Sequence, residues 1–121
     1  MKTLGLALVL LVALEHLWFL VLEMFLWTKP LGLRTFRQTA EAARASATLA
    51  ANQGLYNGFL AAGLLWSLGS PPERALALQA FFLGCVVAAG VFGAATVSRR
   101  ILYVQALPAA LALGLLWLAR S

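Results

Sequence analysis

The sequence is poor in the residues that build catalytic and metal sites. Its 121 residues include four acidic side chains, one histidine and one cysteine. A single cysteine excludes a disulfide within the chain, and Cys85 stands in an apolar run with no neighbouring base to activate it. One histidine and so few carboxylates are a poor ligand set, so we expect no metal site. The chain also has no phosphate-binding loop and no Ser-His-Asp pattern.

Apolar residues, by contrast, dominate the composition. They make up 63% of the chain and charged residues 11%, where an ordinary soluble domain has roughly 25% charged residues. The mean hydropathy is +0.90, which indicates a membrane protein. The net charge is +5, but the basic residues lie between the apolar segments rather than along one face. We therefore expect a lipid bilayer, and no nucleic acid, as the partner.

The apolar segments predict the fold class. We expect an all-α protein, an integral membrane four-helix bundle that forms one transmembrane domain over residues 1–121. The predicted helices cover about residues 4–27, 40–68, 72–97 and 100–119. Pro30 and Gly32 are expected to break the first helix, and Pro108 to kink the last. The first segment lacks a small-x-small cleavage site and stays apolar to Trp27, so it is interpreted as a membrane helix rather than a signal peptide.

The basic residues also predict the orientation. With the N-terminus inside, the cytoplasmic parts would contain Lys2, Arg74 and Arg120. With the N-terminus outside, they would contain Lys29, Arg34, Arg37, Arg44, Arg99 and Arg100. Cytoplasmic loops carry an excess of Lys and Arg, so six against three favours a multi-pass protein with both termini outside.

The first apolar segment carries residues that hydrocarbon disfavours, namely Glu15, His16 and Glu23. A charged side chain at the centre of a membrane helix costs about 3 kcal/mol, so nearby groups must compensate for it. At about 100° per residue, His16, Glu23 and Trp27 lie within about 40° of one another, and Glu15 lies about 100° away. We interpret Glu23 and His16 as a proton donor and acceptor pair.

A second polar stripe lies on the second predicted helix. It consists of Asn52, Gln53, Tyr56 and Asn57. At ~1.5 Å per residue, Glu23, Gln53 and Gln105 all lie roughly 7 to 10 Å to the cytoplasmic side of their helix midpoints. This shared depth predicts a polar pocket in the cytoplasmic leaflet, inside the bundle or between subunits. Its expected ligand-binding residues are Asn52, Gln53, Tyr56, Asn57, Gln105, Trp27, Arg99 and Arg100.

Three functions fit these polar residues. The first is binding, and possible chemical modification, of a small amphiphilic or lipid-like molecule, with Glu23 and His16 handling the proton. The second is a proton-coupled exporter of small molecules in which Glu15 is the coupling group. The third is a structural helix-bundle subunit whose polar residues only hold helices together. Whether the protein is an enzyme is left open, and a homo-oligomer is expected.

The chain resembles a bacterial family of small membrane proteins known as domain of unknown function 1304. The resemblance is carried by EHLWFLVLEMFLW, ANQGLYNGFLAAGL, GVFGAATV and QALPAALALGLL, which together span nearly the whole sequence. It implies the bacterial inner membrane as the location and a fold, but no activity.

A fainter resemblance is to the MAPEG superfamily (membrane-associated eicosanoid and glutathione metabolism). It is carried by ANQ followed by FLA, and by Tyr103, Gln105 and Pro108. It implies a four-helix trimer with both termini outside and a glutathione site near the cytoplasmic side. The basic and acidic residues that these enzymes place around the corresponding Asn are absent beside Asn52, and the spacing from Gln to Pro differs.

Overall fold

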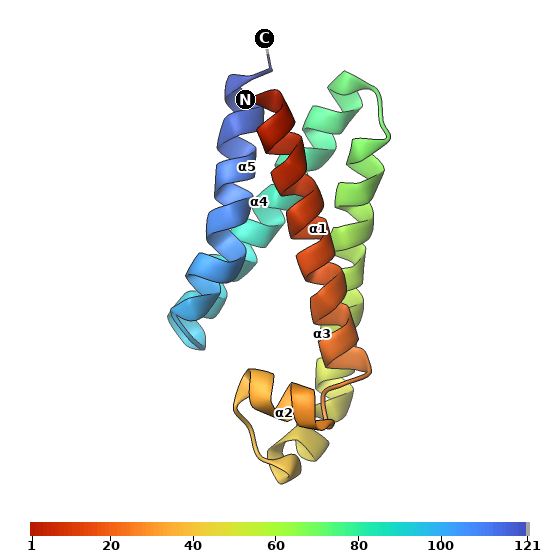
Figure 1. Ribbon diagram of the computed structural model, residues 1–121, viewed down its shortest axis with the longest axis vertical. Helices are drawn as coiled ribbons and strands as arrows, with labels where there is room; N and C mark the ends of the chain where they lie inside the picture. Colours follow the sequence, from red (N-terminus) through yellow and green to blue (C-terminus); the bar gives the residue numbers. More distant parts are fainter. Residues whose placement is uncertain (121) are drawn as a thin grey trace. The chain divides into compact units, whose positions relative to one another are not determined.

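The fold is all-α, as predicted. The computed structural model describes residues 1–120, and these form helices and no strands. Figure 1 shows the elements in chain order. They are α1 (Lys2–Met24), α2 (Pro30–Phe36), α3 (Ala40–Leu68), α4 (Pro72–Thr96), a π-helical turn η1 (Leu102–Ala106) and α5 (Leu107–Leu118). The predicted helix over about 100–119 is therefore partly π-helical.

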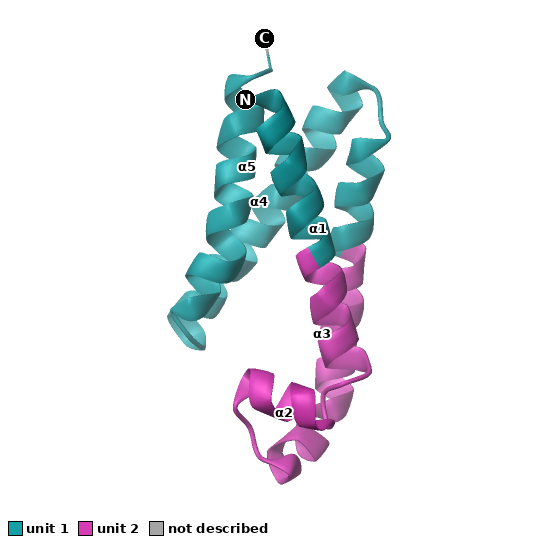
Figure 2. Ribbon diagram, viewed as in Figure 1, with its two compact units in different colours: residues 1–14, 60–121 teal, residues 15–59 magenta. Residues whose placement is uncertain are grey.

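The chain divides into two compact units (Figure 2). Unit 1 consists of Met1–Leu14 and Leu60–Ser121, and unit 2 of Glu15–Phe59. Helices α1 and α3 each pass from one unit into the other without interruption. The expectation of a single domain stays a prediction, and each unit is described by itself.

The core of unit 1 is built from small and branched apolar side chains. Its buried members are Val9, Val12, Ala13, Leu64, Leu83, Val86, Ala109, Ala112 and Leu116. Two helical segments approach closely at Gly90 of α4, where an added Cβ would lie 2.7 Å from the Cβ of Ala106 and 2.8 Å from its backbone nitrogen. Such small-residue contacts are the usual way in which apolar helices pack without a strong hydrophobic driving force.

The π-helical turn η1 lies directly before Pro108. The backbone N–H of Leu107 donates to the carbonyl of Leu102, five residues back. Because proline has no N–H, Pro108 cannot form the α-helical bond to the carbonyl of Val104, and its ring crowds that carbonyl. The sequence analysis expects a kink at Pro108, and the structure has a wider π-helical turn just before it.

Unit 2 contains a short helix that the sequence analysis did not expect. Helix α1 ends at Met24, and Pro30 does not simply break helical structure but occupies the first turn of α2. Proline suits that position because its N–H would be unpaired there anyway. Gly32 allows α2 to fold against the preceding turn, since an added Cβ would lie 1.9 Å from the carbonyl oxygen of Leu26. The helix ends at Phe36 and is followed by the cap residue Arg37, which has a left-handed φ of 51°.

Two of the helices have the length and composition of membrane spans. They are Lys2–Met24, with a mean hydropathy of 2.3, and Pro72–Thr96, with 2.2. The apolar stretch Leu102–Leu118 is shorter. Among the described residues, α3 is not apolar enough to belong with them, because the charged Glu41 and Arg44 of its first turns and its central amides lower its hydropathy.

Candidate functional site

A hydrogen bond between Glu23 and Asn57 is the central polar contact of unit 2. The Nδ2 group of Asn57 donates to Oε1 of Glu23 over 2.5 Å. Asn57 is buried, with 8% of its surface exposed, and Glu23 is half-buried. The bond joins α1 to α3 near the end of α1, so one of the amide donors expected for Glu23 does reach it.

Two glycines explain why α1 and α3 come close enough for this bond. An added Cβ at Gly54 would lie 3.0 Å from the Cβ of Glu23 and 3.2 Å from the carbonyl oxygen of Leu20. An added Cβ at Gly58 would lie 2.6 Å from Cδ1 of Leu20. The GLYNG sequence thus forms a GxxxG contact surface, which lets two helix backbones approach closely.

The other polar residues of α3 lie on its open side. Asn52, Gln53 and Tyr56 are exposed, and the Tyr56 ring lies 6.1 Å from that of Phe59. At about 100° per residue, the two glycines lie to one side of Asn57 and these three residues to the other. Asn57 therefore marks the border between the helix contact and an exposed polar face. We call Asn52, Gln53, Tyr56 and Asn57 the α3 polar face.

The two remaining polar residues of α1 have different surroundings. His16 is fully buried and its ring lies edge-on to Phe19 at 5.2 Å. It lies seven positions before Glu23, about 10 Å along the helix axis, so a proton relay between them would need an intervening group and stays a prediction. Oε1 of Glu15 is buried and has no hydrogen-bond partner among the described residues.

Trp27 contacts both α2 and α3, and its expected role in ligand binding stays a prediction. Its Nε1 donates to Oγ of Ser46 over 3.1 Å, and its ring lies 4.7 Å from the ring of Phe36. Ser46 in turn donates to the carbonyl of Ala42 at 2.8 Å. These contacts fasten α2 to the first turns of α3.

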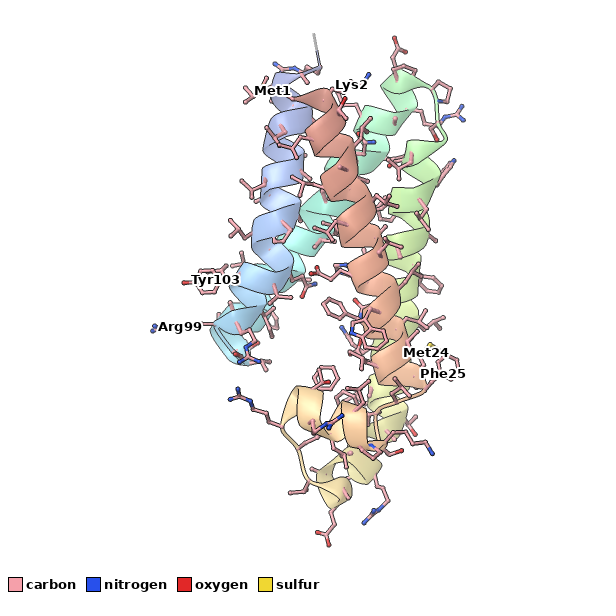
Figure 3. All side chains as sticks on the ribbon, viewed as in Figure 1. Met1, Lys2, Met24, Phe25, Arg99 and Tyr103 are labelled. Carbon is pink, nitrogen blue, oxygen red and sulfur yellow. The ribbon has the colours of Figure 1, made fainter. Side chains whose placement is uncertain are left out.

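The other expected site residues belong to unit 1. Gln105 lies within η1, and Arg99 and Arg100 are exposed in the turn after α4. Figure 3 shows the side chains of Arg99, in the turn, and Tyr103, in η1, pointing away from the backbone. The expected convergence of Gln105 and the two arginines with Glu23 stays a prediction. No group of three or more metal-ligating side chains occurs within residues 1–120.

A pocket in unit 1, lined by polar and apolar side chains, was missed by the sequence analysis. It has a volume of about 200 Å³, and Ser67 and Gln79 are among its lining residues. Nε2 of Gln79 donates to Oγ of Ser67 at 3.3 Å, and both side chains are buried. An amide in the otherwise apolar stretch ALALQAFFLG was the one signal available, because a polar side chain in such a run needs a partner.

Comparison with known proteins identifies a matching family and a similar protein. The family model described as "Protein of unknown function (DUF1304)" matches residues 10–117. The chain is also 31% identical over 115 residues to "Uncharacterized protein YpaA" of Lactococcus lactis subsp. lactis (strain IL1403), covering 93% of this chain and 96% of that protein. No solved structure matches the chain. None of these matches concerns the MAPEG superfamily, so that resemblance stays a prediction.

Proposed function

This chain belongs to the DUF1304 family, and from that premise we propose that it is a membrane protein that binds a small amphiphilic molecule. The proposed site consists of the Glu23 carboxylate and the α3 polar face. The molecule would enter from the cytoplasmic leaflet of the bacterial inner membrane. The observation that carries the proposal is the exposed polar face beside the partly buried Glu23–Asn57 bond.

The distribution of apolar surface supports a membrane location. In the most apolar 18-residue stretch of each helix, only 28% of α1 and 22% of α4 is buried. Large apolar side chains remain exposed along the helices, for example Leu11 at 52%, Phe92 at 71% and Leu111 at 52%. Soluble monomers rarely expose continuous apolar surface on this scale, whereas a lipid bilayer covers it at no cost. With α3 and the η1–α5 segment as further spans, the chain would cross the membrane four times.

Within a membrane, the α3 polar face needs a polar partner. An amide or hydroxyl transferred to an apolar medium without a hydrogen bond costs roughly 2–7 kcal/mol. Asn52, Gln53 and Tyr56 are exposed in a single copy of the chain, so something must cover them. A ligand with a hydrogen-bonding head group and an apolar tail would do so, because the aromatic pair Tyr56 and Phe59 lies beside the amides.

Glu23 is suited to recognise a donor on that head group. One of its two carboxylate oxygens accepts from Asn57, and the second is a further acceptor for a ligand hydroxyl or amine. Asn57 holds the carboxylate in position at the edge of the polar face. A second copy of the chain is the alternative cover for the face, which is why the proposed assembly is a homo-oligomer, with a trimer favoured by the resemblance to MAPEG proteins.

Native mass spectrometry of the gently solubilised protein tests this proposal. The wild type is compared with Glu23→Gln, which keeps an oxygen that can accept from Asn57, and with Glu41→Gln, a matched change at the exposed start of α3. We expect the wild type and Glu41→Gln to retain the same small molecule and Glu23→Gln to lose it without a change in subunit number. Equal retention in all three proteins, or no bound molecule in the wild type, would overturn the proposal. Added glutathione tests the ligand implied by the MAPEG resemblance.

One observation favours a second function. The buried Oε1 atom of Glu15 has no hydrogen-bond partner within residues 1–120. A carboxyl group that alternately binds a proton and a cationic substrate needs such an available oxygen. Proton-coupled export would then use Glu15 rather than Glu23. Proteoliposomes distinguish the two: export predicts substrate movement driven by a pH gradient that Glu15→Gln abolishes and Glu23→Gln retains.

A further inference from the structure

The pocket of unit 1 lies at one end of its helices. The start of α1, the end of α5 and the turn between α3 and α4 meet there, and Figure 3 shows Lys2 at this end. Six of its lining residues carry the inference: Lys2, Ser67, Ser70, Pro72, Gln79 and Arg120. All of them belong to unit 1, so this pocket is independent of the Glu23 site.

The charge of the pocket wall has one sign. Lys2 and Arg120 line it, and no carboxyl side chain of the described residues does. Arg120 is held in place, because its Nη1 donates to the carbonyl of Trp117 at 2.5 Å and its guanidinium lies 4.3 Å from the centre of the Trp117 ring. A guanidinium has five N–H donors, so this anchoring leaves donors for a ligand.

The inner wall of the pocket adds neutral hydrogen-bonding groups. Gln79 has 3% of its surface exposed and Ser67 1%, and the bond between them uses one of the two N–H groups of the Gln79 amide. Helix α4 begins at the rim with Pro72, and its N-cap residue Pro71 makes no side-chain hydrogen bond. The N-terminal end of a helix carries partial positive charge, which Glu73 in the first turn of α4 offsets in part, so the positive charge of the pocket comes mainly from Lys2 and Arg120.

We propose that this pocket binds a phosphate ester, with Lys2 and Arg120 contacting the phosphate and Gln79 the attached polar group. The volume of about 200 Å³ is close to that of six or seven water molecules at about 30 Å³ each, enough for a phosphate with a glycerol-sized substituent. Both a phospholipid head group and a soluble phosphate ester present this chemistry. Because the pocket lies where helices end, it is positioned for the interface of the bilayer rather than its centre.

The test uses the full chain in detergent micelles and three probes. Phosphatidylglycerol is compared with diacylglycerol carrying the same acyl chains, and both with sn-glycerol 3-phosphate, by native mass spectrometry with titration. We expect phosphatidylglycerol to bind the wild type at least about tenfold more tightly than diacylglycerol does, since each of the two cations attracts the anionic head group. Competition by glycerol 3-phosphate at similar affinity would identify a soluble ester as the ligand, and its failure to compete would identify the lipid. Equal binding of the two lipids together with no binding of glycerol 3-phosphate overturns the proposal without any variant.

Variants locate the binding. Lys2→Gln with Arg120→Gln removes both cations, and Arg74→Gln removes an exposed cation of the first turn of α4 that does not line the pocket. The double variant should lose the tenfold preference for phosphatidylglycerol, whereas Arg74→Gln should keep it. If all three proteins show the same preference, the phosphate is bound elsewhere and the proposal is wrong.

Discussion

Replacing Asn57 with leucine should loosen the pairing of α1 with α3 in unit 2. Leucine branches at Cγ as asparagine does and is the larger of the two, so the change removes a hydrogen bond without opening a cavity. Interhelical hydrogen bonds in membrane bundles average about 0.6 kcal/mol and reach about 1.7 kcal/mol. Because Asn57 is 8% exposed and its partner is a carboxylate oxygen, we expect a loss near the upper end, about 1–2 kcal/mol.

The assay is reversible unfolding in mixed micelles with a rising fraction of sodium dodecyl sulfate, followed by circular dichroism. Asn52→Leu is the matched control, since it makes the same substitution on the exposed side of the same helix. It should change the free energy of unfolding by less than about 0.5 kcal/mol. Glu23→Gln should be milder than Asn57→Leu because it retains an acceptor. An Asn57→Leu protein as stable as Asn52→Leu would refute the reasoning that this bond holds the two helices together.

Two further predictions concern packing. Gly90→Ala should destabilise unit 1 by about 1–3 kcal/mol, since the added Cβ would lie 2.8 Å from the backbone nitrogen of Ala106. Gly84→Ala in the same helix is the control, because its added Cβ would meet no atom within 4 Å. Its free energy of unfolding should stay within about 1 kcal/mol of that of the wild type. The same titration measures both, and equal stability of the two variants would contradict the observed contact. Trp27→Phe should keep the ring but lose the bond to Ser46, which costs about 0.5–1.5 kcal/mol and should speed tryptic cleavage within α2. Cleavage at the wild-type rate would show that the bond does not hold α2.

Much of the helical pattern could be predicted from the sequence, because long apolar runs separated by Pro, Gly and charged turns are compatible with few structures other than helices. The exceptions have physical causes. Helix α2 was missed because Pro30 can either break a helix or begin one, and the choice depends on whether Gly32 can approach the carbonyl of Leu26. The turn η1 was missed because its extra width depends on how Pro108 is accommodated, which the sequence does not specify.

The candidate site was predictable in part. Helical spacing and depth brought Glu23 and the amides of α3 to one level, but they could not select Asn57 from its neighbours. That choice depends on rotation, and Gly54 and Gly58 determine it by turning one face of α3 toward α1. The hydrogen bond between Ser67 and Gln79 could not be predicted from the sequence, because it depends on how α3 and α4 align across their turn.

The bond between Glu23 and Asn57 also has a consequence for how the protein is made. The two residues are 34 positions apart, so Glu23 emerges from the ribosome before its hydrogen-bond donor does. If α1 entered lipid alone, Glu23 would be without its partner during that interval, at a cost of several kcal/mol. Insertion of α1 and α3 together, as a hairpin, avoids this cost, and co-translational insertion should therefore stall until residue 57 has emerged.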